Sequence, residues 1–372
     1  MKKILSLCVI LLIALTAFVG CQKDAGVIKI GVAGPHTGDL ASYGIPTVKA
    51  AELVVADWNA NGGVLGKQIE LVVEDDVCDP KVAPDVATKL IGEGVVGVIG
   101  HICSGATEAA LGIYLDSNIP VISPSATNPP LTQSGAYPNF FRTIAPDDAQ
   151  AVLEVNFVLN TLGKTKIAVL HDKQSYGKGL AEFAKTFIEQ SNKGEVVLFE
   201  GIQADSVDYS AVINKVENSG ADAIIYGGYH PEASKLVSQM KEKGINLVFV
   251  SDDGVKDDTF IEVAGDAAEG VYASGPNDTT QDPIAVKAKN DHVAKYSEEP
   301  GAFFYNAYAA TQAMLNAISK AGSTDYEKIR SALMSNYVDT ALGKISFDEK
   351  GDAIGVGFSM FQVQNGVYVE VK

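Results

Sequence analysis

The stretch VVGVIGHICSGATEAALGIYLD, Val95–Asp116, contains a complete strand, turn and helix pattern. Val95–Ile99 is an apolar run without polar alternation, which predicts a strand that is covered on both faces. Glu108–Asp116 has the spacing of a helix. Gly100–Thr107 lies between them and places a histidine, a cysteine and a serine at the carboxyl end of the strand. The stretch therefore predicts one βα unit whose strand end carries reactive side chains.

The same alternation extends along most of the chain. Further strand-like runs are Ile28–Ala33, Ile69–Val73, Val121–Ile122, Ile167–Leu170, Val196–Phe199, Ala223–Tyr226 and Leu247–Val250, with a final pair at Phe358–Val363 and Val367–Val371. Segments of helical period are Val48–Asn59, Ala83–Ile91, Ala149–Leu162, Gly179–Gln190, Tyr209–Asn218, Ala233–Lys243, Ile284–Tyr296 and Phe303–Ala321. This βαβα order predicts an α/β fold with parallel, doubly wound sheets. A length of 372 residues favours two domains.

The N-terminus has the layout of an export signal. A basic Met1–Lys3 precedes an apolar stretch that ends at Gly20-Cys21, so residues 1–20 are expected to be a signal peptide and residues 21–26 a linker. Phe18-Val-Gly-Cys21 resembles a lipobox, although Phe18 stands where leucine is commoner. We therefore expect Cys21 to carry lipid and to tether the protein to a membrane.

Composition excludes several classes of function. The net charge of −17 argues against nucleic-acid binding, which needs clustered Lys and Arg. The segment Gly62–Gln68 lacks the spacing of a phosphate-binding loop, and the glycines near Gly31 do not form a dinucleotide fingerprint. The histidines are dispersed and are expected to be hydrogen-bonded residues rather than metal ligands. We expect no cofactor and no metal.

Two cysteines remain after Cys8 and Cys21 are assigned to the leader and the anchor. Cys78 and Cys103 are an even pair in an exported protein, which favours a disulfide. The alternative is a two-thiol metal site, which is weak because no histidine or third cysteine lies at zinc-ligand spacing.

Hydroxyl, carboxyl and aromatic side chains follow several of the predicted strands. In parallel sheets, ligands bind beyond the carboxyl ends of the strands, so these residues are candidates for a cleft between two lobes. They lie in His101–Ser104, Ser123–Thr127, His171–Tyr176, Gly227–His230 and Ser251–Asp253.

A catalytic interpretation of the opening stretch is the main alternative. A Cys103 nucleophile needs an unbonded thiol and a base within reach, such as His101. A disulfide to Cys78 removes that thiol. Ser104 lacks the G-x-S-x-G context of a nucleophile elbow, and we expect it to cap a helix that begins near Thr107 while facing the cleft. The sequence therefore favours binding over catalysis.

The strand-end motifs together resemble the branched-chain amino-acid binding proteins of ABC importers. The resemblance covers essentially the whole mature chain. It rests on Ser42-Tyr43-Gly44, Asp75–Pro80, Gly100–Ser104, Ser123–Thr127, His171–Gly177, Gly227–Glu232, Gly301–Phe303 and Phe347–Asp352.

This resemblance implies a periplasmic-binding-protein type I fold, with two Rossmann-like lobes joined by three hinge crossings near Pro146, Pro276 and Asp348. The N-terminal lobe is expected to comprise residues 27–145 and 277–348, and the C-terminal lobe residues 146–276 and 349–372. The family's disulfide falls on Cys78 and Cys103.

The resemblance also implies how a ligand is held. Ser104, the Thr127 backbone N–H and Tyr229 are expected to bind the α-carboxylate. The Ser125 carbonyl, the Thr127 hydroxyl and Asp253 are expected to bind the α-ammonium, since a buried zwitterion needs donors at one end and acceptors at the other. The aliphatic side chain is expected among Tyr43, Ile102, Cys103, Ala126, Tyr176 and Phe303.

Two positions depart from the family pattern: Asp253 replaces Glu, and Ser125 replaces Ala, which adds a hydroxyl near the cleft. The expected function is a monomeric, lipid-anchored receptor that captures leucine, isoleucine or valine and delivers it to an ABC permease. The alternatives are the same fold holding another small amino acid or amide, an exported hydrolase using Cys103 or Ser104, and a sensory module fused to a signalling segment.

Overall fold

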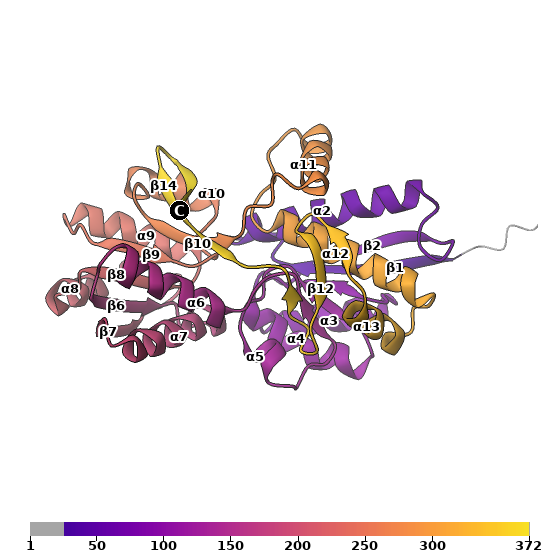
Figure 1. The fold of residues 1–372 in the computed structure, drawn as a ribbon, viewed down its shortest axis with the longest axis horizontal. Helices are drawn as coiled ribbons and strands as arrows, with labels where there is room; N and C mark the ends of the chain where they lie inside the picture. Colours follow the sequence, from indigo (N-terminus) through magenta and orange to yellow (C-terminus); the bar gives the residue numbers. More distant parts are fainter. Residues whose placement is uncertain (1–25, 372) are drawn as a thin grey trace, which may run out of the picture.

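The protein consists of two α/β lobes in the computed structural model, which describes residues 26–371 (Figure 1). One lobe contains a five-stranded sheet in the order β2-β1-β3-β4-β5, and the other a seven-stranded sheet in the order β15-β14-β10-β9-β8-β6-β7. A small sheet, β11-β12-β13, completes the topology of these residues. The structure confirms the predicted class of two doubly wound, Rossmann-like lobes.

The first lobe is built on parallel strands that the first part of the chain supplies. These are β1 Val27–Gly34, β2 Gln68–Asp75, β3 Val98–Ile99, β4 Val121–Ser123 and β5 Phe140–Arg142. Its helices are α2 Ala41–Ala60, α3 Ala83–Gly92, α4 Ser104–Asp116, α5 Pro130–Gln133, α11 Pro283–Tyr296, α12 Phe304–Ala321 and α13 Tyr326–Ser335. The small antiparallel sheet is formed by β11 Val338–Thr340, β12 Gly343–Phe347 and β13 Ala353–Ile354.

The second lobe repeats the pattern and adds two antiparallel strands at one edge. The parallel strands are β6 Lys166–His171, β7 Glu195–Gly201, β8 Ala223–Gly227, β9 Val248–Ser251 and β10 Tyr272–Pro276, and β14 Phe358–Gln364 and β15 Val367–Val371 pair antiparallel. The helices are α6 Asp147–Asn156 with its π-helical extension η1 Phe157–Thr161, α7 Ser175–Ser191, α8 Ser210–Ser219, α9 His230–Glu242 and α10 Asp258–Ala264, followed by the 3-10 turn η2 Gly265–Ala267.

Helices cover both faces of each main sheet, which explains why the strands lack polar alternation. In the first lobe, Ile30 of β1 packs with α2 and α12, whereas Val98 of β3 packs with α3 and α4 on the other face. In the second lobe, Val169 of β6 packs with α6 and α7, and Leu170 packs with α8, α9 and α10. The result is two separate cores with the strand ends left between them.

The chain passes between the lobes three times. It leaves the first sheet after β5 and enters α6, returns after β10 to α11 and α12, and leaves again between β13 and β14 (Figure 1). The residue boundaries predicted for the two lobes stay a prediction. The signal peptide, the linker up to residue 25 and the Cys21 anchor lie outside the described residues. Within residues 26–371, the structure has no helix that is both long and apolar enough for a bilayer crossing.

Several helices begin earlier than the sequence predicts, among them α4 and α2. α4 begins at Ser104, so Ser104 is its first residue and extended Cys103 precedes it, rather than Ser104 capping a helix near Thr107. The Ser104 Oγ instead accepts a hydrogen bond from the backbone N–H of Asn128 at 3.3 Å. α2 begins at Ala41, which places Tyr43 on a helix instead of on the preceding loop. Both corrections move predicted binding residues into the first turn of a helix.

Candidate ligand-binding site

The opening stretch reaches the cleft because a glycine follows β3. Gly100 has a φ of +118°, and a Cβ there would lie 2.0 Å from the carbonyl oxygen of Ala33. Only glycine combines this backbone conformation with so close an approach to β1. The turn directs the chain into α4, so Ile102 and Ser104 lie at the carboxyl ends of the strands.

A small cavity lies between the two lobes at this edge. Its walls are formed by Tyr43, Ile102, Ser104, Ser125, Tyr176, Tyr229, Asp253, Gly254 and Phe303. Both lobes therefore contribute hydroxyl or aromatic side chains to one small enclosed space.

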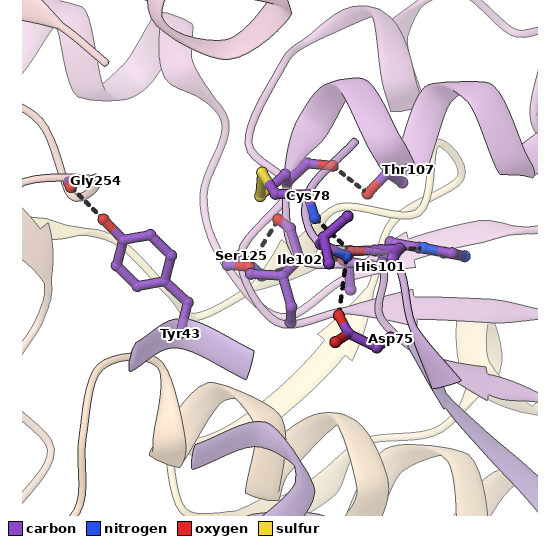
Figure 2. Close-up of a disulfide and its surroundings, with 12 residues drawn as sticks. Tyr43, Asp75, Cys78, His101, Ile102, Thr107, Ser125 and Gly254 are labelled. Carbon is purple, nitrogen blue, oxygen red and sulfur yellow. Dashed lines mark hydrogen bonds and ion pairs between the residues drawn. A yellow bond between two sulfur atoms is a disulfide. The ribbon is translucent and has the colours of Figure 1, made fainter. Parts of the chain in front are cut away.

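One part of the cavity wall offers hydrogen-bond donors. Ser104 is the first residue of α4, where backbone N–H groups lack helical acceptors and the helix dipole favours negative charge. The Ser125 hydroxyl does not add a free donor to this part of the wall, because its Oγ donates to the backbone carbonyl of Ile102 at 2.9 Å (Figure 2). The hydroxyl that distinguishes this chain from the family pattern is therefore engaged with the protein itself.

Another part of the cavity wall is a buried carboxyl group, Asp253. Its Oδ1 accepts hydrogen bonds from Tyr176 Oη at 2.5 Å and from Gln150 Nε2 at 2.9 Å. Burial raises the pKa of Asp253 above its ordinary value of 3.8, whereas these two hydrogen bonds oppose the rise. A ligand cation placed here would stabilise the ionised carboxylate.

Aromatic rings form the rest of the wall. The Tyr43 ring contacts Tyr229 and Phe303 with centroid distances of 6.1 and 5.6 Å, and Tyr176 contacts Tyr229 at 5.2 Å. Burial raises the pKa of the Tyr43, Tyr176 and Tyr229 hydroxyls well above 10.0, so they stay neutral hydrogen-bond donors. The wall is apolar with polar edges, as an aliphatic side chain attached to a charged backbone requires.

Several hydrogen bonds join the lobes across the cleft. Tyr43 Oη on α2 donates to the Gly254 carbonyl, as Figure 2 shows. Ser42 Oγ lies 3.2 Å from His230 Nε2 on α9. The Asn128 Nδ2 donates to Ser175 Oγ on α7 at 2.9 Å. The lobes are therefore in contact around the cavity.

The disulfide between Cys78 and Cys103 is present, with a Cα–Cα distance of 5.5 Å (Figure 2). A disulfide-bonded Cys103 is not a nucleophile. His101 also has a structural role, because its fully buried ring joins Asp76 Oδ2 at 2.5 Å and Tyr114 Oη at 3.0 Å. Within residues 26–371, the structure has no group of three or more His, Cys, Asp or Glu side chains that could hold a metal ion.

Three of the predicted binding residues lie just outside the cavity wall. Cys103 lines an adjoining outer pocket that shares Tyr176 and Tyr229 with the cavity. Ala126 and Thr127 are fully buried behind the wall. The Thr127 hydroxyl is buried without a hydrogen-bond partner. Burial raises the pKa of the neighbouring Asp147 carboxyl well above its ordinary value, and the Thr127 hydroxyl opposes that rise.

Three further residues at the site were not among the sequence predictions. Gly254 lines the cavity and accepts from Tyr43, and Gln150 holds Asp253. Arg142 is fully buried and donates to the Thr127 carbonyl at 2.7 Å, which fixes the loop after β4. Gly254 follows a predicted strand end, so position alone could have suggested it. Nothing in the sequence indicates Gln150 or Arg142, because neither follows a predicted strand end. Gln150 is on the helix α6, and Arg142 is on β5, a strand of only three residues.

The fold and the cavity define a two-lobed protein with a small cavity between facing strand ends, whose wall carries both hydrogen-bond donors and a carboxyl group. The chain belongs to the periplasmic binding protein family, whose family model matches residues 27–367.

Relatives and solved structures agree with this membership. The leucine-, isoleucine-, valine-, threonine- and alanine-binding protein of Pseudomonas aeruginosa is 39% identical over 94% of this chain and 93% of its own length. The Leu/Ile/Val-binding protein of Escherichia coli is 36% identical, over 93% of each chain. The structure is similar to that of LivJ, the branched-chain amino acid transporter substrate binding protein of Streptococcus pneumoniae, in complex with isoleucine. The TM-score is 0.84 and the sequence identity is 31%, and the match covers 93% of this chain and 100% of LivJ.

Proposed function

We propose that this protein captures branched-chain L-amino acids outside the cytoplasm and delivers them to an ABC permease without chemically changing them. The observation that carries the proposal is the cavity wall, which brings together the first residue of α4, the Asp253 carboxyl group and aromatic and aliphatic side chains. A buried zwitterion needs both ends satisfied. The names of the relatives and the isoleucine bound to LivJ support the same ligand class.

The residues proposed to contact the ligand divide by charge. Ser104, the backbone N–H of Thr127 and Tyr229 bind the carboxylate, and Asp253 binds the ammonium group together with the Ser125 carbonyl and the Thr127 hydroxyl. Tyr43, Ile102, Cys103, Ala126, Tyr176 and Phe303 surround the aliphatic side chain. The shared cavity wall supports all of these residues except Cys103, Ala126 and Thr127, which lie next to it. For Thr127, support comes from a buried hydroxyl without a partner.

A thermal-shift screen of all standard amino acids, followed by calorimetric titration, tests the proposal. Leucine, isoleucine and valine should raise the unfolding temperature, because a ligand that binds only the folded state stabilises it by mass action. Asp253→Asn should weaken this effect strongly. An absence of response to every aliphatic amino acid would overturn the proposal.

A wider ligand range is the second candidate. The Pseudomonas aeruginosa relative is named for threonine and alanine as well, and the hydroxyl of Ser125 is already bonded to Ile102. The same screen separates the two candidates, since shifts with alanine or threonine that match those with leucine would favour the wider range.

The proposal includes a membrane tether through Cys21 and a monomeric state. Wild-type protein expressed in a bacterium with a lipoprotein pathway should fractionate with membranes, and Cys21→Ser should be released into the soluble exported fraction. Equal release of both proteins would contradict the anchor. Sedimentation of the Cys21→Ser protein should give one chain of about 39.1 kDa, less the leader.

A further inference from the structure

Two side chains hold the same oxygen of the Asp253 carboxyl group. Its Oδ1 accepts from both Tyr176 Oη and Gln150 Nε2, whereas its Oδ2 receives no hydrogen bond from a side chain within residues 26–371. Asp253 lines the cavity, and Gln150 is fully buried behind it on α6. The two donors therefore fix which oxygen stays available on the cavity side.

The orientation of the Gln150 amide follows from its neighbours. Nε2 also donates to Ser274 Oγ on β10 at 2.7 Å, and Ser274 Oγ donates in turn to Glu154 Oε1 at 2.7 Å. Because Ser274 gives its proton to Glu154, it accepts from Gln150, and the amide presents its NH₂ group to Asp253. The chain of hydrogen bonds connects the cavity with α6 and β10, the elements next to the first two crossings between the lobes.

We propose that Gln150 is a positioning residue for ligand recognition. By holding Oδ1 of Asp253, it directs Oδ2 to the ammonium group of the bound amino acid, which thereby meets a single preset acceptor. The proposal rests on the proposed function, since it assumes a ligand with a primary ammonium group.

The alternative is that Gln150 merely satisfies buried polar groups between α6 and β10. Such a structural role would weaken binding of every ligand by a similar factor, because the whole lobe would be loosened. A positioning role acts through the ammonium group, so it leaves the binding of an amine-free analogue unaffected. The two roles therefore predict different ratios between the affinity for an amino acid and the affinity for its amine-free analogue. The stability of the folded protein does not distinguish them.

Calorimetry with L-leucine and with 4-methylpentanoate, which is leucine without its amine, measures this ratio. Gln150→Met keeps an unbranched side chain of similar length and removes the hydrogen bonds. It should weaken leucine binding about tenfold, as for the loss of a hydrogen bond to a charged group, while 4-methylpentanoate competes as it does with the wild-type protein. Ser274→Ala, a smaller change, should shift leucine affinity in the same direction by about twofold to fivefold.

Gln312→Met is the matched control, because Gln312 Oε1 accepts from Ala341 in the first lobe, away from the cavity. It should leave both affinities unchanged. Equal losses for leucine and 4-methylpentanoate in both test variants, or unchanged leucine binding, would overturn the role of Gln150. If the wild-type protein binds no branched-chain amino acid, the proposed function fails first, and the role of Gln150 fails with it.

Discussion

The hydroxyl of Tyr43, on a helix of the first lobe, donates to the backbone carbonyl of Gly254 in the second lobe at 2.5 Å. Both residues line the cavity, so this bond closes its wall and joins the lobes in one contact. The bond exists only while the lobes lie together. The energy that it contributes therefore favours the closed form over any form with the lobes apart.

Tyr43→Phe should consequently weaken leucine binding by about twofold to tenfold, because a buried hydrogen bond contributes about 0.5–1.5 kcal/mol net. Calorimetric titration checks the affinity. Tyr296→Phe is the control, since Tyr296 bonds to Glu52 at a distance from the cavity. Equal affinities for Tyr43→Phe and the wild type would show that the contact contributes nothing to closure.

Ser125→Ala should leave the ranking of leucine, isoleucine and valine unchanged. The Ser125 hydroxyl donates to Ile102 and does not face a ligand, so its loss should cost about 1 kcal/mol of folding free energy and no selectivity. Titrations with the three amino acids and urea unfolding measure both effects. A reversal of the ranking would mean that the hydroxyl turns toward the ligand during binding.

Arg142 and Asp352 should behave as one unit. Arg142 is fully buried, its Nε donates to Asp352 Oδ1 at 2.5 Å, and removal of one partner leaves a charge without compensation. Arg142→Met should destabilise the protein by about 3–5 kcal/mol in urea unfolding. Arg142→Met with Asp352→Asn should cost less than the sum of the single changes. Strict additivity would contradict this coupling.

Asp172 should make stability depend on pH. Burial, with Glu232 nearby, raises its pKa from 3.8 to about 7 in the folded chain. Between these values the folded chain holds the proton more tightly than the unfolded chain, so this group's contribution to stability declines as pH rises. Asp172→Asn keeps an oxygen that can accept the Gln174 N–H and removes the titration. Between pH 4 and 7 the free energy of unfolding of the variant should therefore rise relative to that of the wild type, by up to about 4 kcal/mol.

Urea unfolding of both proteins at several pH values across this window gives the difference directly. Two curves that run parallel from pH 4 to 8 would rule out a raised pKa for Asp172. If the stability of the variant fell relative to the wild type as pH rises, the pKa of Asp172 would have to be lowered in the folded chain instead of raised.

Much of the architecture could be predicted from local pattern. The runs at β6 and β8 are apolar between their ends, and only Lys29 interrupts the run at β1, so these strands were found to within one or two residues. β5 was missed because Phe140–Arg142 is too short to give a pattern. Its buried arginine depends on partners elsewhere in the chain, among them Asp352 and the Thr127 carbonyl. The start of α4 was placed too late because the serine at that position contacts Asn128 instead of its own helix.

By itself, the sequence determined which segments become strands and helices, and which side chains stand at strand ends. This was possible because burial on both faces and helical spacing restrict the residue types at neighbouring positions. Only the tertiary structure decided which of those side chains share one cavity. Tyr43 and Gly254 are far apart in the chain and meet across two lobes, and Gln150 reaches Asp253 from a helix that carries no motif. Such contacts depend on how the lobes pack, and no local pattern records them.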